Sequence, residues 1–148
     1  MTRINSGIDH SKLVNAHAFA EYRELTRIPT DVLSGKANLN KIPGKFTLNT
    51  GHESFFYDKQ LYLLKRYKML LKSVIERGYN INEEIVARNI TNFVTIQRDY
   101  PHLWNDYDDS NDSPILIERI TERLMGMKNL KYYKENITKE KALEILNS

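Results

Sequence analysis

The stretch YDKQLYLLKRYKMLLKSVIER, residues 57–77, carries the clearest structural signal in the sequence. Its apolar side chains recur every three or four residues, a spacing that places them on one face of an α-helix. They are Leu63, Leu64, Tyr67, Leu70, Leu71, Val74 and Ile75. Lys65, Lys68 and Lys72 fall on the other face, and Gly78 follows in a position typical of helix ends. We therefore expect a helix over residues 57–77 that packs its apolar face into the core.

Two more principal helices are predicted, one on each side of this segment. Residues 11–28 carry an apolar stripe at helical spacing, with Ser11 as the N-cap and Pro29 at the end. The other helix opens at Ser113, because Pro114 suits the first position of a helix.

The remaining segments are shorter or less regular. Residues 79–113 show no long helical periodicity, and we expect short pieces there, with a solvated acidic loop at 105–112. A short amphipathic helix is predicted over 138–146, and Phe55 and Phe56 are expected in the core. The prediction is an all-α fold, residues 1–148 forming a single compact domain of three principal helices with long connecting loops.

Composition narrows the function. The 148 residues include no cysteine, which excludes disulfides and thiol chemistry. The histidines are scattered, and phosphate-loop and dinucleotide motifs are missing, so we expect neither a metal nor a cofactor. No apolar run approaches the roughly 18 residues of a membrane span, and we expect a cytoplasmic protein without a membrane partner. The net charge of +3 is only weak evidence for a nucleic-acid partner.

The start of the chain, Met1-Thr2-Arg3-Ile4-Asn5, contains a candidate nucleophile. A small residue after Met1 favours removal of the methionine, which would leave Thr2 with a free α-amine. Such an amine titrates near pH ~8, well below a lysine, so more of it is unprotonated and nucleophilic at neutral pH. Arg3 beside it would lower that pKa further and could hold a phosphate.

The helix predicted at 11–28 carries a polar arc of His17, Arg23, Glu24 and Arg27 beside its apolar stripe. It could be an ordinary solvated face with a Glu24–Arg27 ion pair. The functional interpretation is that Glu24 and the arginines meet the Thr2 amine in one site. An amine, a carboxylate and clustered arginines suit attack on C1′ of a deoxyribose, with formation of an imine.

Other basic residues are candidates for contact with DNA, although each could instead belong to a solvated surface, which for lysines on a loop is the more common case. Lys41 and Lys45 lie in a Gly/Pro loop, and Arg119 and Arg123 share one face of the third helix. In the segment Leu130-Lys131-Tyr132-Tyr133-Lys134, basic residues are interleaved with aromatic ones, as in segments that stack on bases and follow the backbone.

Several motifs in order resemble the pyrimidine-dimer DNA glycosylase/AP lyase family, of the phage endonuclease V type that also occurs in large algal viruses. They are Met1-Thr2-Arg3-Ile4-Asn5, Ala20-Glu21-Tyr22-Arg23-Glu24-Leu25, Thr50-Gly51-His52, Phe55-Phe56-Tyr57-Asp58-Lys59, Arg77-Gly78-Tyr79-Asn80-Ile81, Asn105-Asp106-Tyr107 and Lys131-Tyr132-Tyr133. Lys41-Ile42-Pro43 with residues 46–52 is close to the algal-virus branch. Residues 6–16 depart from the family pattern, and residues 135–148 look like a C-terminal addition.

The resemblance implies roles for individual residues. Thr2 matches the N-terminal nucleophile and Glu24 the catalytic carboxylate. Arg3, Arg23 and Arg27 match phosphate-binding arginines, and His17 matches a histidine that lines the site. Arg119 and Arg123 fall where the third helix contacts the DNA backbone.

The implied function is excision of the 5′ base of cyclobutane pyrimidine dimers in UV-damaged duplex DNA, followed by strand cleavage through β-elimination. The expected partner is double-stranded DNA containing dimers or abasic sites, bound by a monomer in the cytoplasm, or in the host cell cytoplasm if the gene is viral. Three alternatives remain: an abasic-site lyase, a glycosylase for another damaged base, and a non-catalytic DNA-binding protein on the same scaffold.

Overall fold

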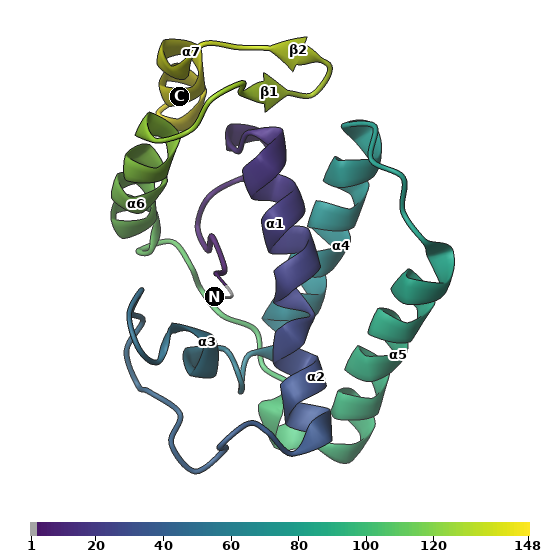
Figure 1. Cartoon of the computed structure of the whole chain (residues 1–148). Coiled ribbons are helices and arrows are strands. Elements are labelled where there is room, and N and C mark those ends of the chain that lie inside the picture. The colour runs from purple at the N-terminus through teal and green to yellow at the C-terminus, as the bar shows by residue number, and fades with distance from the viewer. Residues whose placement is uncertain (1–2) are drawn as a thin grey trace. The chain divides into compact units, whose positions relative to one another are not determined.

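The computed structural model describes residues 3–148 and confirms the all-α fold (Figure 1). Its helices are α1 (Asn15–Leu25), α2 (Arg27–Ser34), α3 (His52–Phe55), α4 (Gln60–Glu76), α5 (Glu83–Asp99), α6 (Ser113–Met125) and α7 (Lys139–Leu146), with short 3₁₀ turns at His10–Lys12 and Pro101–Leu103. Strands β1 (Lys131–Tyr132) and β2 (Glu135–Asn136) pair antiparallel. In the described part of the chain, no helix has the length and apolar character needed to cross a membrane.

The contacts of the chain divide it into two compact units. Unit 1 contains Arg3 and Ile4 together with residues 23–68 and 81–107, and unit 2 contains residues 5–22, 69–80 and 108–148. Helices α1 and α4 each have one end in unit 1 and the other end in unit 2. The prediction of a single domain stays a prediction.

Helix α4 confirms the strongest sequence signal. Leu63, Tyr67, Leu70 and Val74 are fully buried, as their spacing predicts. Ile75, at the edge of the stripe, is instead 54% exposed. The helix ends before Gly78, whose φ of +95° lies in the left-handed region that glycine adopts without steric cost.

The helix predicted over residues 11–28 was wrong at both ends. Ser11 lies in a 3₁₀ turn capped by the Asp9 side chain, and α1 begins only at Asn15. Helix α1 ends at Leu25, and α2 then runs through Pro29 to Ser34. Proline has no N–H to bond the carbonyl of Leu25, but it is tolerated in the first turn of a new helix, where N–H groups lack helical partners anyway. The proline therefore divides the helix instead of ending it.

The prediction that residues 79–113 hold no long helix was also wrong. Helix α5 has 17 residues, and the Asn82 side chain caps it by accepting hydrogen bonds from the backbone N–H groups of Glu84 and Ile85. Its fully buried residues are only Phe93 and Ile96. With so narrow an apolar contact and many β-branched residues, the segment has little helical signal in sequence, and tertiary packing decides its structure.

Unit 1 buries two apolar groups. In the first, Val32 of α2 packs with Ile96 of α5 and with Leu103, and Trp104 covers them. Figure 1 shows α2 and α5 next to each other in this unit. The second is an aromatic cluster of Phe46, His52, Phe55, Phe56, Tyr62 and Tyr107. Phe55 and Phe56 are buried in it, as the sequence predicts.

The acidic segment at 105–112, predicted as a solvated loop, is partly structural. Asp112 is buried and accepts a hydrogen bond from the Ser6 hydroxyl at 2.6 Å, and Asp109 accepts one from the Gly7 N–H at 2.9 Å. Gly7 has a φ of +78°, and a Cβ there would lie 2.6 Å from the Asp109 carbonyl oxygen. These side chains fix residues 6–7 in unit 2.

Arg77 joins three segments of unit 2. Its guanidinium donates hydrogen bonds to the carbonyl oxygens of His10 and Leu13, to Asn15 Oδ1 and to Ser73 Oγ, at 2.7–3.0 Å. It also lies 4.4 Å from the ring centre of Tyr133. Arg77 is 5% exposed, and burial lowers the pKa of its guanidinium from the usual value.

The C-terminal residues 135–148 are an integral part of unit 2. Helix α7 begins where predicted, with Thr138 as its N-cap; it packs against α6, and its Ala142 and Leu146 are buried. The backbone N–H of Ile137 donates to the Leu130 carbonyl oxygen at 3.0 Å.

The substitution Arg77→Lys tests this network. A lysine ammonium offers three donors from one point and cannot reach the acceptors that the planar guanidinium spans, so buried carbonyl groups lose their partners. We expect unfolding free energy to fall by about 2–4 kcal/mol, measured by urea denaturation at pH 7. The matched control Arg88→Lys, on the exposed face of α5, should change stability by less than about 0.5 kcal/mol. Equal effects of the two substitutions would contradict the role of Arg77.

Candidate functional site

The chain's beginning is anchored in unit 1 by a histidine. The backbone N–H of Ile4 donates to His52 Nε2 at 2.9 Å, and His52 Nδ1 lies 2.7 Å from the carbonyl oxygen of Thr47. A carbonyl only accepts, so Nδ1 carries the proton and Nε2 is free to accept from Ile4. His52 is 2% exposed, and the rings of Phe46 and Phe56 stand edge-on to it. This holds the backbone two residues after Thr2, which itself lies outside the described residues.

The candidate carboxylate and the three candidate arginines of the N-terminal half also belong to unit 1. Arg3 is buried, Glu24 is half-buried in the last turn of α1, and Arg23 and Arg27 are exposed. The break between α1 and α2 falls at Thr26, between Glu24 and Arg27. The two exposed guanidinium groups can therefore approach a ligand from solvent, whereas Arg3 is held in the protein.

Two other predicted DNA contacts of unit 1 lie in the loop between α2 and α3. Lys41 and Lys45 are both exposed there. Exposed lysines on such a loop can contact phosphates at little structural cost, but the same exposure suits a solvated surface. Their role stays a prediction.

Sequence reasoning missed a carboxyl pair beside Arg27. Burial raises the pKa of Glu53, and the charge of Asp31 and a hydrogen bond between the two carboxyl groups raise it further, while Arg27 opposes the shift. Burial also raises the pKa of Tyr57, with contributions from the same two carboxylates. No motif marks this pair, because Asp31 lies on α2 and Glu53 on α3. Among residues 3–148, no group of three or more His, Asp and Glu side chains is arranged to hold a metal ion.

In unit 2 the structure brings His17 of α1 and Arg123 of α6 together. Burial lowers the pKa of His17 from 6.5 to about 4, and the positive charge of Arg123 lowers it as well. His17 is therefore neutral at pH 7. Arg123 is exposed. One turn earlier, Arg119 Nε lies 3.9 Å from Glu122 Oε2.

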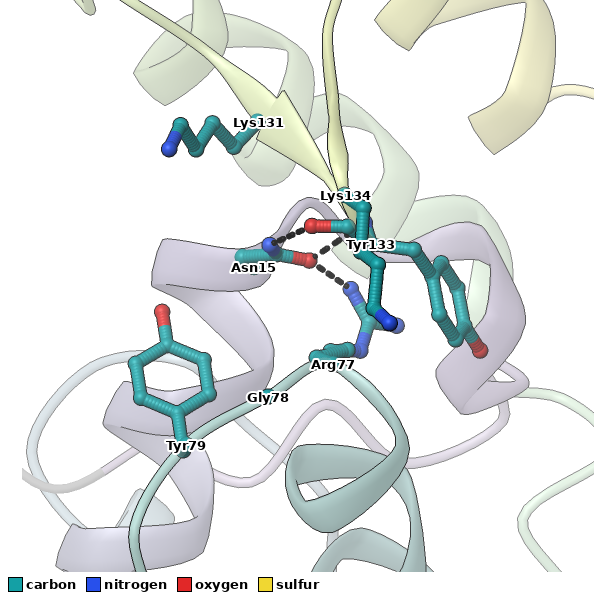
Figure 2. Close-up of a pocket in the computed structure, with 7 residues that line it drawn as sticks. All are labelled: Asn15, Arg77, Gly78, Tyr79, Lys131, Tyr133 and Lys134. Atoms are coloured by element: carbon teal, nitrogen blue, oxygen red, sulfur yellow. Dashed lines mark hydrogen bonds between the residues drawn. The ribbon is translucent and has the colours of Figure 1, made fainter.

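The aromatic residues of the predicted stacking segment have structural partners in unit 2. The Tyr132 hydroxyl donates to the Ser11 carbonyl oxygen at 2.7 Å, and the Tyr133 ring packs against the guanidinium of Arg77. The Asn15 side chain makes two hydrogen bonds with the Tyr133 backbone (Figure 2). Its Nδ2 donates to the Tyr133 carbonyl oxygen at 2.7 Å, and its Oδ1 accepts from the Tyr133 N–H at 2.8 Å. Lys131, by contrast, is exposed.

The low pKa of His17 predicts acid sensitivity. Between pH 6.5 and about 4 the unfolded chain binds a proton at His17 that the native protein does not, so stability falls as pH falls through this window. By pH 4.5 the loss from this group should reach roughly 2–3 kcal/mol. Urea denaturation at pH 7 and pH 4.5 should show a smaller loss for His17→Gln than for the wild type. His102→Gln, at an exposed histidine, is the control, and a wild-type loss in His17→Gln would contradict the assignment.

The N-terminal part of the chain matches a protein-family model. The model for pyrimidine dimer DNA glycosylase matches residues 1–86, more than half of the chain. The matched part includes Thr2, Arg3, His17, Arg23, Glu24 and Arg27. It does not extend to α6 or to the hairpin β1–β2, so the family assignment rests on the N-terminal part of the sequence. The chain belongs to the pyrimidine dimer DNA glycosylase family.

Proposed function

We propose that this protein excises the 5′ base of cyclobutane pyrimidine dimers in duplex DNA and then cleaves the strand as an AP lyase. The Thr2 α-amine is the proposed nucleophile and Glu24 the proposed catalytic carboxylate. The observation that carries the proposal is the family match over residues 1–86, which contains this pair together with Arg3, Arg23 and Arg27.

The local structure supports a catalytic role for the chain's beginning. An α-amine nucleophile is useful only if the segment that follows it is held in place. The hydrogen bond from Ile4 to the buried His52 supplies such a restraint, and Glu24 belongs to the same unit. Arg3, one residue after Thr2, adds a buried positive charge, which favours the unprotonated amine.

The first chemical step exchanges one bond at the sugar for another. The nitrogen of the Thr2 amine attacks C1′ of the deoxyribose, the bond from C1′ to the base breaks, and the base leaves with the bonding electrons and gains a proton. The carboxylate of Glu24 stabilises the positive charge that develops on the sugar. Opening of the sugar ring then gives an imine between Thr2 and C1′.

The second step breaks the strand. The imine makes the C2′ proton acidic, and Glu24 accepts this proton as a general base. The electron pair released at C2′ expels the 3′ phosphate, which completes the β-elimination. Arg23 and Arg27, exposed near Glu24 in sequence, are proposed to hold the flanking phosphates through charge-assisted hydrogen bonds.

Borohydride trapping tests the proposed nucleophile. Reduction of the imine should give a stable covalent adduct with both dimer-containing and abasic duplexes, and mass spectrometry of its peptides should locate the bond at Thr2. Insertion of one serine between Met1 and Thr2 is the control, because it moves the amine by roughly 3.3–3.6 Å and should abolish the adduct.

The outcomes of this experiment separate the alternatives. An adduct with abasic DNA alone would support an abasic-site lyase and contradict dimer excision. No adduct with either duplex, for a protein whose intact mass shows that Met1 is removed, would contradict the enzyme mechanism and leave a DNA-binding protein. An adduct on a lysine would contradict the role of Thr2.

The substitution Glu24→Gln tests the carboxylate. Glutamine keeps the size and the hydrogen-bonding groups of the side chain but removes its charge, so the transition state loses its stabilisation. We expect DNA affinity to stay within about twofold of the wild type, and single-turnover strand cleavage to slow by about 10²–10⁴-fold. Wild-type cleavage by this variant would show that Glu24 has another role. Glu122→Gln, at an exposed carboxylate of α6, is the control and should cleave normally.

A further inference from the structure

Two adjoining hollows in unit 2 are lined by lysines. The larger has a volume of about 420 Å³ and is lined by Lys131 and Lys134, and the smaller, of about 230 Å³, by Lys128 and Lys131. Asn15, Tyr79 and Lys131 line both, so the two hollows are neighbours, and we call them together the lysine groove. Among the described residues, no Asp or Glu lines either hollow.

The positive charge of the groove is not neutralised within the described part of the protein. All three lysines are exposed, and their ammonium groups make no hydrogen bond or ion pair there. Two other lysines of unit 2 do have partners for their ammonium groups. Lys139 donates to the carbonyl oxygen of Met125, and Lys141 Nζ lies 3.6 Å from Glu144 Oε1. Ammonium groups held around a concave surface without carboxylates attract anions.

Arg77 supplies a further positive charge to the lining of the groove. Arg77 lines the larger hollow, and its hydrogen-bond partners are carbonyl, amide and hydroxyl groups, all of them neutral. The guanidinium is therefore satisfied as a donor, but its charge is not balanced by a carboxylate. Because Arg77 is buried, its field is screened less by water than that of a surface arginine.

The walls of the groove are held in a defined position. Tyr133 has a φ of +55°, an unfavourable value for a tyrosine, and its two backbone hydrogen bonds with Asn15 together with packing on Arg77 hold it there. This conformation turns the chain between β1 and β2, and Lys131 and Lys134 flank it. On the other wall, the Tyr79 ring stacks on Phe19 with centres 4.3 Å apart. Figure 2 shows Lys131 and Tyr79 on the same side of Asn15, and Lys134 beside Arg77.

We propose that the lysine groove binds backbone phosphates of the DNA duplex, with Lys128, Lys131 and Lys134 as the contacting cations and the Tyr79 hydroxyl as a neutral donor. The ammonium groups act as point charges that track phosphates without reading the base sequence. Tyr132 and Tyr133 are then structural, since their own contacts hold the hairpin that carries the lysines. The inference rests on the proposed function only in that duplex DNA is the substrate.

The salt dependence of binding tests this proposal. The double variant Lys128→Ala/Lys134→Ala removes two phosphate contacts and leaves Lys131 and the hairpin in place. The slope of log K against log salt for an undamaged duplex should become shallower by about 2, because each phosphate contact contributes about 0.9. The decrease in affinity at a given salt concentration should be equal for undamaged and dimer-containing duplexes.

Two matched variants complete the experiment. Lys68→Ala/Lys72→Ala removes two exposed lysines of α4 outside the groove and should leave the slope within about 0.5 of the wild type. Lys128→Arg/Lys134→Arg keeps both charges and should keep the wild-type slope. Thermal melts of all variants should match the wild type, because the substituted side chains are exposed.

Three results would overturn the proposal. One is a wild-type slope in Lys128→Ala/Lys134→Ala, and another is an equal change in the α4 control, which would mean that only net charge matters. The third is a loss of affinity confined to dimer DNA, or dependent on base sequence, which would mean that the groove holds a base. If the proposal holds, borohydride trapping of Lys128→Ala/Lys134→Ala at saturating protein stays at the wild-type level. A failure of the groove proposal can therefore be told apart from a failure of the Thr2 mechanism.

Discussion

A buried guanidinium is the interaction on which the structure of unit 2 depends. Arg77 ties the end of α4 to the segment before α1 and to the hairpin β1–β2 by hydrogen bonds and by packing on Tyr133. A buried charge is costly unless its donors are satisfied, and here the partners come from segments far apart in sequence. The native arrangement of these segments is therefore the one in which Arg77 is satisfied. This dependence links the stability of unit 2 to the geometry of its cationic surface.

In unit 1 the corresponding constraint acts on the start of the chain. Terminal residues are commonly mobile unless something ties them down, and an amine nucleophile needs a defined position. His52 ties down Ile4, with its tautomer set by the Thr47 carbonyl group and its ring enclosed by aromatic side chains. The residue that organises this end of the chain is thus 48 positions away in sequence. It has no catalytic role in the mechanism proposed above, and its contribution is one of position.

The predictions from sequence succeeded where local signals agree with one another. Helix α4 combines an apolar stripe with a glycine just beyond its end. Helix α6 begins at Ser113, next to Pro114, and α7 begins directly after its N-cap Thr138, and both signals act within a single turn. They failed where distant contacts prevail. Helix α5 packs Phe93 and Ile96 into the core of unit 1, and the buried Asp112 accepts a hydrogen bond from Ser6, more than a hundred residues away. Neither partner can be recognised from the local pattern.

The amino-acid sequence by itself determined the helical class, the approximate extent of α4, the starts of α6 and α7 and the residue types of the candidate site, because helix periodicity, caps and motif order are local properties. It also carries the family membership, through residues 1–86. Only the tertiary structure decided that His52 anchors the chain's beginning, that Asp31 and Glu53 share a hydrogen bond, and that Arg77, Asn15 and Tyr133 shape a groove lined by lysines. The physical reason is that hydrogen bonds, burial and charge act through space, between residues whose separation along the chain leaves no repeating pattern to read.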